Sequence, residues 1–332
     1  MNALPPSTKA VAHVRRRIVE LMDWPMNASP LKPGEVAGRT IATLVSAGTE
    51  INGNFDVERT APWVGGYAAV FEVTNVGSAV TDLRSGQHVL AMGPHAAWQR
   101  MAREEVVPLP PDLSPITATF ARMMSVSWTT LTTTAARPPD RVLIAGLGLV
   151  GNLAAQMFRA AGYRVTAVDA LDRRRQFASR AGIADVRAAV SGEKDLIDSI
   201  SLAIECSGNE QTMLDCCRVV AKGGEVVLVG VPWRKRTDVR AFDVVHAIFH
   251  RHVTLRSGWE WELPRRTTEF RSGSVYGNFA AAMDWLAERR VSVDGMYRIF
   301  RPAQAQEVYD SLCRRDNEFL TAVFDWQGEQ IK

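Results

Sequence analysis

The sequence has few cysteines and little net charge, and each shortage excludes a class of protein. Its four cysteines have neither the density of a disulfide scaffold nor the paired spacing of a zinc site: Cys206, Cys216, Cys217 and Cys313. We therefore expect reduced thiols that pack as small apolar residues. The formal net charge is only +3, and no basic run is interleaved with aromatic residues, so no nucleic-acid partner is expected.

Long apolar runs and targeting signals are also lacking. The chain does not start with basic residues followed by an apolar core, and no window approaches the length of a membrane span. We therefore expect a cytoplasmic protein with a small-molecule substrate and no membrane partner. With 332 residues, of which 46% are hydrophobic, the chain can bury a large core and form two domains.

What the sequence does contain is a glycine-spaced turn between an apolar strand and a helix. Residues 141–151 read Arg-Val-Leu-Ile-Ala-Gly-Leu-Gly-Leu-Val-Gly, with the spacing of a dinucleotide-binding fingerprint. Gly146 permits the tight turn, Gly148 lets the backbone approach a pyrophosphate, and Gly151 lets helix and strand pack closely. The helix N-terminus offers free N–H donors to the phosphates. A glycine-rich structural turn is the alternative interpretation.

The context that this fingerprint requires follows it. A helix is expected over 152–161, with a strand over 163–168 that ends at Asp169, 21 residues after Gly148. An acid there hydrogen-bonds the ribose hydroxyls and repels a 2′-phosphate, so the sequence predicts NAD rather than NADP. Three arginines follow at 173–175 and weaken this prediction, because arginine can hold a 2′-phosphate. The alternative interpretation of these arginines is the solvated first turn of a helix over 172–181. The predicted cofactor contacts in this region are Leu149, Val150, Asp169 and Arg174, beside the three glycines.

Two kinds of periodicity divide the chain. Up to about residue 115, Gly and Pro separate short strand-like runs at 9–14, 35–44, 68–75 and 88–92, which is typical of barrel-like β structure. From residue 117, helical segments alternate with apolar strands at 142–145, 165–168, 202–206, 226–229 and 253–256, which is typical of a doubly wound sheet. The chain ends with a helix, a strand, a helix and a strand, at 276–289, 296–300, 302–314 and 320–324. The predicted fold class is α/β.

In this order and in several phrases, the chain resembles the medium-chain dehydrogenase/reductase superfamily. The phrases are Lys-Pro-Gly-Glu-Val at 32–36, the segment 76–90, Glu-Cys-Ser-Gly at 205–208 and the segment 222–230. The resemblance implies a chaperonin-10-like β-barrel catalytic domain at 1–116, completed by about 265–332, and a Rossmann NAD-binding domain at 117–264. It also implies cofactor contacts from Cys206, Gly208, Gly230 and Val231, and a homo-oligomer, dimer or tetramer, paired through the edge of the Rossmann sheet.

Departures from the superfamily concern zinc. Zinc-dependent members have Gly-X-Cys-Gly-Thr-Asp where this chain has Val-Ser-Ala-Gly-Thr-Glu at 45–50, so Ala47 replaces the thiolate ligand. Their Gly-His-Glu phrase corresponds to Gly-Gly-Tyr at 65–67, so Gly66 replaces the imidazole. The segment 92–108 has no cysteine, whereas a structural zinc lobe needs four. The resemblance therefore predicts no metal, and a zinc-lacking branch similar to sugar and polyol dehydrogenases.

Without zinc, protein donors must stabilise the charge that develops on the reacting oxygen. Thr49 stands where the family has a proton-relay hydroxyl, and Tyr67 offers a phenol. His95 follows a barrel strand, and histidine suits general acid/base exchange, so it is the preferred proton carrier. Glu50 is expected to orient these groups. The alternatives are a turn-capping threonine, a packing tyrosine and a structural histidine.

Tryptophans beside carboxylates indicate the substrate class. Trp259, Glu260 and Trp261 follow the last Rossmann strand, and Trp63 and Trp98 belong to barrel segments. Aromatic faces and carboxylate acceptors suit polyhydroxylated rings, although a core or dimer-contact cluster is the alternative.

The sequence thus predicts a metal-independent, NAD-dependent oxidoreductase that transfers hydride between nicotinamide and a secondary alcohol or ketone on a sugar, cyclitol or related polyol. Three alternatives remain open. Metal-free members of the superfamily also reduce quinones and enones, and a neighbouring branch oxidises the hydroxyethyl side chain of a tetrapyrrole. A cofactor-binding structural or sensing protein without catalysis is the third.

Overall fold

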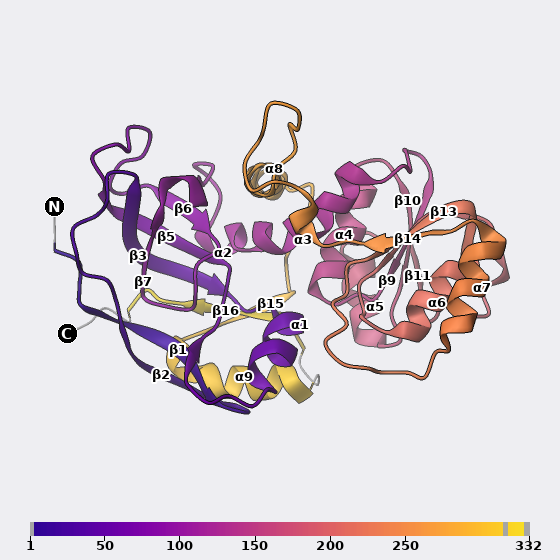
Figure 1. Cartoon of the computed structure of the whole chain (residues 1–332), viewed down its shortest axis with the longest axis horizontal. Coiled ribbons are helices and arrows are strands. Elements are labelled where there is room, and N and C mark those ends of the chain that lie inside the picture. Colours follow the sequence, from indigo (N-terminus) through magenta and orange to yellow (C-terminus); the bar gives the residue numbers. More distant parts are fainter. Residues whose placement is uncertain (1–2, 315–317, 329–332) are drawn as a thin grey trace. The chain divides into compact units, whose positions relative to one another are not determined.

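The computed structural model describes residues 3–314 and 318–328, and the chain divides into two compact units (Figure 1). Unit 1 takes Met1–Arg122, Phe279–Ala287 and Val293–Lys332, and unit 2 takes Met123–Asn278 and Glu288–Ser292. The first division thus lies after residue 122 rather than 116. Residues 265–278, which were expected to help complete the catalytic domain, lie in unit 2.

Unit 1 is a β domain with two sheets. The smaller has the order β2-β1-β4, formed by Ile18–Pro25, Ser7–Arg15 and Trp63–Val64. The larger has the order β15-β16-β3-β5-β6-β8. In that order, these strands are Tyr297–Phe300, Thr321–Asp325, Glu35–Leu44, Ala69–Val76, His88–Ala91 and Val106–Pro108. Strand β7 (Trp98–Ala102) also pairs with β3. Strand β16 pairs antiparallel with β3, so the C-terminal segment completes the sheet that the N-terminal segment begins.

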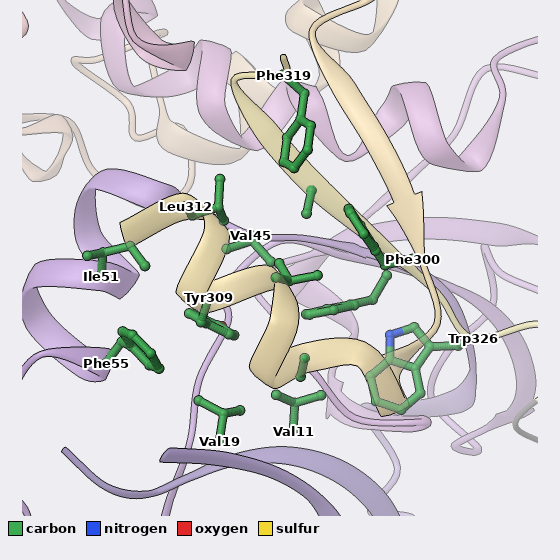
Figure 2. Packing of buried hydrophobic residues seen from close by; sticks show 14 of the residues in the cluster. Val11, Val19, Val45, Ile51, Phe55, Phe300, Tyr309, Leu312, Phe319 and Trp326 are labelled. Carbon is green, nitrogen blue, oxygen red and sulfur yellow. The ribbon is translucent and has the colours of Figure 1, made fainter. Parts of the chain in front are cut away.

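Helix α9 (Ala305–Arg314) covers the main core of unit 1 (Figure 2). Its buried residues Val308, Tyr309 and Leu312 recur at helical spacing and therefore share one face. They pack with apolar side chains from β1, β2 and the segment 45–55. That segment forms the short helix α1 (Ala47–Glu50) and a π-helical turn (Ile51–Phe55). Packing against a C-terminal helix thus holds the segment that resembles the zinc phrase.

Unit 2 contains a six-stranded parallel sheet of order β11-β10-β9-β12-β13-β14. The strands are Asp185–Arg187, Arg164–Val168, Arg141–Ala145, Ile200–Glu205, Val220–Leu228 and Thr254–Ser257. Helices α4 to α7 alternate with them along the chain: Leu149–Ala160, Asp172–Arg180, Glu210–Val219 and Ala241–Arg251. This strand order is that of a doubly wound Rossmann sheet, so the predicted α/β fold class is confirmed.

The remaining helices are short or cross the division between the units. Helix α3 (Phe120–Thr133) begins in unit 1 and continues in unit 2, and α8 (Val275–Ala287) runs the other way. The short elements are α2 (Pro115–Ala118) and 3-10 turns at Arg103–Glu105, Lys194–Leu196, Glu260–Glu262 and Pro302–Gln304. Over residues 3–314 and 318–328, no helix has both the length and the apolarity that a membrane crossing requires.

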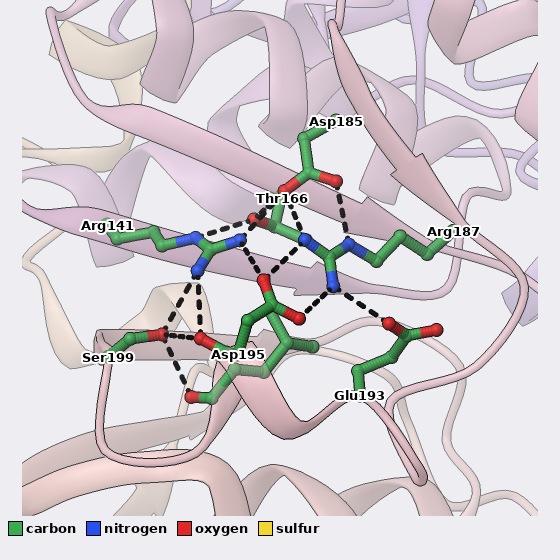
Figure 3. A network of polar contacts seen from close by, with 8 residues as sticks. Arg141, Thr166, Asp185, Arg187, Glu193, Asp195 and Ser199 are labelled. Carbon is green, nitrogen blue, oxygen red and sulfur yellow. Dashed lines mark hydrogen bonds and ion pairs between the residues drawn. The ribbon is translucent and has the colours of Figure 1, made fainter.

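The edge strand β11 was not predicted, because its three residues contain no apolar run. An ion-pair network holds it in place (Figure 3). Asp185 on β11 accepts hydrogen bonds from Arg141 at 2.9 Å and from Thr166 at 2.7 Å, which lie on β9 and β10. Arg187 bonds Asp185 and also Asp195, both at 2.7 Å. Side-chain pairing across three strands therefore replaces hydrophobic patterning at this edge.

Candidate active site

Three glycine-containing loops pack against one another at the carboxyl ends of β9, β12 and β13. Gly146 has φ of +98° and Gly208 φ of +63°, the left-handed region that favours glycine. A Cβ atom on Gly151 would overlap the carbonyl oxygen of Gly146 and lie 3.2 Å from Cβ of Cys206. A Cβ atom on Gly208 would lie 2.7 Å from the carbonyl oxygen of Val231. The loops meet where the strand order reverses, which is where doubly wound sheets bind their ligands.

Helix α4 presents its N-terminus at this point. Gly148 is its N-cap residue, and a Cβ atom there would have no other atom within 4 Å. The backbone is therefore open to a ligand on that side, and the first-turn N–H groups have no partner within the helix. Leu149 is buried and Val150 is half-buried in the same turn. This arrangement fits a pyrophosphate.

Asp169 lies at the end of β10, beside the glycine turn. Its carboxylate accepts hydrogen bonds from the backbone N–H groups of Leu147 and Leu171, both at 2.8 Å. Arg174 pairs with the same carboxylate at 3.3 Å. Each carboxylate oxygen can accept more than one hydrogen bond, so Asp169 keeps capacity for a ribose hydroxyl. The residues of this edge fit a dinucleotide.

Glu205, which sequence reasoning did not single out, shapes the loop after β12. Its buried carboxylate accepts hydrogen bonds from the N–H groups of Ser207 at 2.7 Å and Gly208 at 3.0 Å. Burial raises the pKa of Glu205 above its ordinary value, although these hydrogen bonds lower it. A Cβ atom on Gly230 would lie 2.9 Å from Oε2 of Glu205. The signal that was missed is an acid at the end of an apolar strand, before Cys-Ser-Gly.

In unit 1, the two segments that resemble the zinc phrases are joined by a hydrogen bond. Tyr67 donates its phenol proton to the hydroxyl of Ser46, and the Thr49 hydroxyl acts to lower the pKa of the same phenol. Burial raises the pKa of Tyr67 above its ordinary value, while Arg122 and the two hydroxyls oppose that increase. We refer to Ser46, Thr49 and Tyr67 as the hydroxyl cluster. Sequence reasoning missed Ser46, although it lies inside the phrase that was compared.

His95 lies against Gly66 and is 0% exposed. Its Nδ1 lies 2.7 Å from the Thr43 hydroxyl, which itself accepts a hydrogen bond from Nε1 of Trp326 at 3.0 Å. Its Nε2 lies 3.0 Å from Oε2 of Glu50. Both ring nitrogens are engaged inside the domain. This corrects the prediction of His95 as the proton carrier that meets the substrate.

Glu50 is the centre of this buried network and is 0% exposed. It accepts hydrogen bonds from His95, from the Tyr309 phenol on α9, and from the backbone N–H of Ser46 at 2.7 Å. Burial by itself raises the pKa of the Glu50 carboxyl. These partners outweigh burial and hold the pKa below its ordinary value, so the group is a carboxylate. Burial raises the pKa of Tyr309, which keeps its phenol a donor. Sequence reasoning missed Tyr309 because it occupies the apolar face of an amphipathic helix.

Comparison with known proteins agrees with the fold. Residues 150–269 match the family of zinc-binding dehydrogenases. An alcohol dehydrogenase of Geobacillus stearothermophilus is 26% identical over 223 residues, which is 63% of this chain and 64% of that enzyme, just under two thirds of its length. Two solved structures from Escherichia coli superpose on this chain with a TM-score of 0.81. Galactitol-1-phosphate dehydrogenase is 18% identical, and the match covers 96% of this chain and 99% of that protein. L-idonate 5-dehydrogenase is 15% identical, and the match covers 98% of this chain and 100% of that protein. This is a medium-chain dehydrogenase/reductase fold.

The family that residues 150–269 match is described as zinc-binding, but the residues at the positions that resemble its ligands do not fit zinc. Ala47 and Gly66 carry no donor atom, and Gly66 has φ of +92°. A Cβ atom on Gly66 would lie 2.7 Å from Cδ2 of His95, so the His95 ring occupies the space that an imidazole at position 66 would need. Within the described ranges 3–314 and 318–328, no group of three or more His, Cys, Asp or Glu residues is arranged to hold a metal ion.

A second buried histidine predicts how the stability of this protein responds to acid. His13 packs edge-on against Tyr309, with ring centroids 4.9 Å apart, and among the described residues neither ring nitrogen has a hydrogen-bond partner. Burial lowers the pKa of His13 to about 4, with Arg59 and His95 lowering it and Glu50 opposing.

Between pH 6.5 and 4 the unfolded chain binds a proton at His13 that the folded protein does not, so folding stability falls as the pH falls through this range. The expected loss is about 3 kcal/mol. Urea unfolding across this range should show the slope, and His13→Gln should remove it. The exposed His250→Gln is the control and should retain it, while an unchanged slope in His13→Gln would contradict the assignment.

The predicted substrate residues divide between the units of this fold. Trp259 is 68% exposed and Trp261 is also exposed, both in unit 2. Trp63 is exposed in unit 1, whereas Trp98 is half-buried against the core. Glu260 is only 5% exposed and accepts a hydrogen bond from Ser125 at 3.1 Å. Its carboxylate is thus enclosed in unit 2, which corrects its prediction as an acceptor for substrate hydroxyls.

Proposed function

We propose that this protein is a metal-independent, NAD-dependent oxidoreductase that acts on a secondary alcohol or the corresponding ketone. The observation that carries the proposal is the hydroxyl cluster. Ser46 and Tyr67 directly adjoin Ala47 and Gly66, the two positions that lack zinc ligands, and they hydrogen-bond each other. A phenol hydrogen-bonded to a hydroxyl is a proton donor and acceptor suited to alcohol chemistry.

The residues proposed to hold the cofactor belong to unit 2, and the hydroxyl cluster belongs to unit 1. When bound, NAD supplies the hydride acceptor at C4 of its nicotinamide. The N-terminus of α4 would hold the pyrophosphate, with Gly148 as the point of close approach. Asp169 would accept hydrogen bonds from the ribose hydroxyls, and the loops that contain Cys206, Gly208, Gly230 and Val231 would contact the nicotinamide half.

Proton exchange falls to Tyr67. In carbonyl reduction, the Tyr67 phenol gives its proton to the substrate oxygen as the carbon receives hydride, and solvent returns a proton to the phenolate. In alcohol oxidation, the Tyr67 phenolate takes the hydroxyl proton as the carbon loses hydride. Ser46 and Thr49 donate hydrogen bonds to the phenolate in both directions. Electrostatic stabilisation of this kind is usually a large part of catalysis.

A sugar, cyclitol or related polyol is the proposed substrate class. Exposed tryptophans in both units offer faces for the C–H surface of such molecules: Trp63, Trp259 and Trp261. The two solved structures named above act, by their names, on a phosphorylated polyol and on a sugar acid, which supports the same class.

The test is NADH formation on a chelator-treated sample, with a panel of polyols and cyclitols set against quinones and enones in the reducing direction. We expect polyol-dependent NADH formation that chelation leaves unchanged. Turnover of quinones or enones alone would instead make the protein a C=C or quinone reductase. Activity only after zinc addition would overturn metal independence, and cofactor binding without turnover of any compound would favour a non-catalytic protein.

Cofactor preference should depend on the charge of Asp169. We expect Asp169→Asn to lower the ratio of kcat/KM with NAD to that with NADP by about 10- to 100-fold, since hydrogen bonds to charged groups contribute roughly 1.5–3 kcal/mol. The amide keeps the size of the side chain and one of the two oxygens that accept hydrogen bonds from the N–H groups of Leu147 and Leu171. Steady-state kinetics with both cofactors provide the measurement. Asp172→Asn, an exposed acid at the start of α5, is the control, and an equal change in both variants would contradict the role of Asp169.

A further inference from the structure

Arg122 places a buried positive charge beside the hydroxyl cluster. Its side chain emerges from the first turn of α3 and is only 4% exposed. The guanidinium carbon lies 4.7 Å from the ring centroid of Tyr67 and 5.6 Å from that of Phe279. All three residues belong to unit 1. The cation therefore faces the phenol ring to which we assign proton exchange.

The chemistry of arginine makes this an invariant charge. A guanidinium does not lose its proton in proteins, so the positive charge persists at every working pH. Burial of such a group is costly, and the faces of two aromatic rings offset part of that cost. Within Phe120–Thr133, Arg122 is the only charged residue. A single cation in an otherwise apolar and hydroxyl-rich helix is a pattern that packing alone does not require.

A fixed cation has its largest effect when its neighbour becomes an anion. Neutral Tyr67 gains only the cation–π attraction, whereas the phenolate gains a direct charge–charge attraction as well. The Glu50 carboxylate acts in the opposite sense on Tyr67, and Ser46 and Thr49 stabilise the phenolate as donors. Arg122 is the cation among these neighbours.

We propose that Arg122 is a positioning residue that stabilises the Tyr67 phenolate, in place of the electrostatic stabilisation that zinc supplies in metal-dependent relatives. This inference rests on the proposed function for its catalytic meaning. The effect of Arg122 on the ionisation of Tyr67 does not depend on the proposed function, because that ionisation is measurable without turnover. When Tyr67 gives its proton to the substrate oxygen, the charge left on the phenolate faces Arg122, and it is removed when solvent returns a proton.

The experiment is a titration of residue 67 by 19F NMR, in full-length protein that carries 3,5-difluorotyrosine at that position. The fluorines lower the intrinsic pKa of the phenol and report its ionisation directly. We expect Arg122→Met to raise the ionisation midpoint by about 1–3 pH units, the usual effect of removing an opposite charge at this range. Arg122→Lys keeps the charge and should stay near the parent midpoint. The same order should appear in the pH profile of kcat.

Matched controls separate charge from packing. Phe279→Leu removes the second stacking partner and no charge, so the midpoint should stay unchanged. Arg266 lies 4.4 Å from the ring centroid of Tyr276 in unit 2, and Arg266→Met removes a similar stacked cation without affecting residue 67.

An unchanged midpoint in Arg122→Met would overturn the proposal, as would equal midpoints in Arg122→Met and Arg122→Lys, because these results assign a packing role. If Arg122→Met does not fold, Arg122→Gln removes the same charge and takes its place in the comparison with Arg122→Lys. If the midpoint shifts as expected but the parent enzyme oxidises no alcohol, the electrostatic role stands and the proposed function falls.

Discussion

Replacement of Tyr67 by Phe should lower kcat by about two to four orders of magnitude, which is the usual contribution of a positioned proton donor. The variant keeps the ring beside Arg122 and loses only the hydroxyl that contacts Ser46 and Thr49. Because the hydroxyl exchanges its proton in the transition state, KM should change much less than kcat. Steady-state kinetics in both directions, with the substrate that the polyol panel identifies, provide the measurement.

Two further variants make this result specific. Tyr297→Phe removes another phenol of unit 1, on β15, and should leave kcat unchanged. Thr49→Val removes a donor to the phenolate but not the proton itself, so its loss should be smaller than that of Tyr67→Phe. Full kcat in Tyr67→Phe would assign proton exchange to another group and would remove the main support for the proposed function.

Replacement of Glu50 by Ala should destabilise the protein by about 3–5 kcal/mol, the usual cost of removing one partner of a buried charged network. The variant leaves Nε2 of His95, the Tyr309 phenol and the N–H of Ser46 without their shared acceptor. The free energy of unfolding, from urea denaturation followed by circular dichroism, provides the measurement. Glu307→Ala, on the exposed face of α9, should change stability by no more than about 0.5 kcal/mol.

A double-mutant cycle with Tyr309→Phe tests whether the network joins the segment 46–50 to α9. Alone, Tyr309→Phe should cost about 1.5–3 kcal/mol, because it removes a hydrogen bond to a charged acceptor. In the Glu50→Ala background this cost should largely disappear, since the acceptor is already gone. Additive effects of the two substitutions would show that Tyr309 and Glu50 stabilise the protein independently.

Most of the fold follows from local patterning. The apolar runs at 35–44 and 142–145 correspond to β3 and β9, and the helix expected over 172–181 corresponds to α5. These elements bury regular faces, so their periodicity is visible in the sequence. The short strand β11 was missed because cross-strand ion pairs hold it. The division between the units was misplaced because α3 continues through it without a break.

The candidate site was predicted in part. The glycine turn and Asp169 are adjacent in a single βαβ unit, so spacing alone places them together. His95 was assigned the wrong environment, because burial depends on what packs around a residue. Its ring contacts Thr43 and Glu50 and lies in the space that a side chain at position 66 would occupy. The Ser46, Arg122 and Tyr309 contacts join segments far apart in the sequence, and no periodicity records such pairs.

By itself, the sequence determined the α/β class, the glycine-spaced turn between β9 and α4, and the absence of side chains that bind zinc at positions 47 and 66. These properties depend on residue identity and short-range spacing, which a chain carries in any conformation. The tertiary structure decided which polar groups meet. It buried Glu50 against the C-terminal helix and His95 beside Glu50, joined Tyr67 to Ser46, and brought the charge of Arg122 to the Tyr67 ring. Such contacts exist only after long-range packing has excluded water and fixed distances between remote segments, so they are decided by folding as a whole.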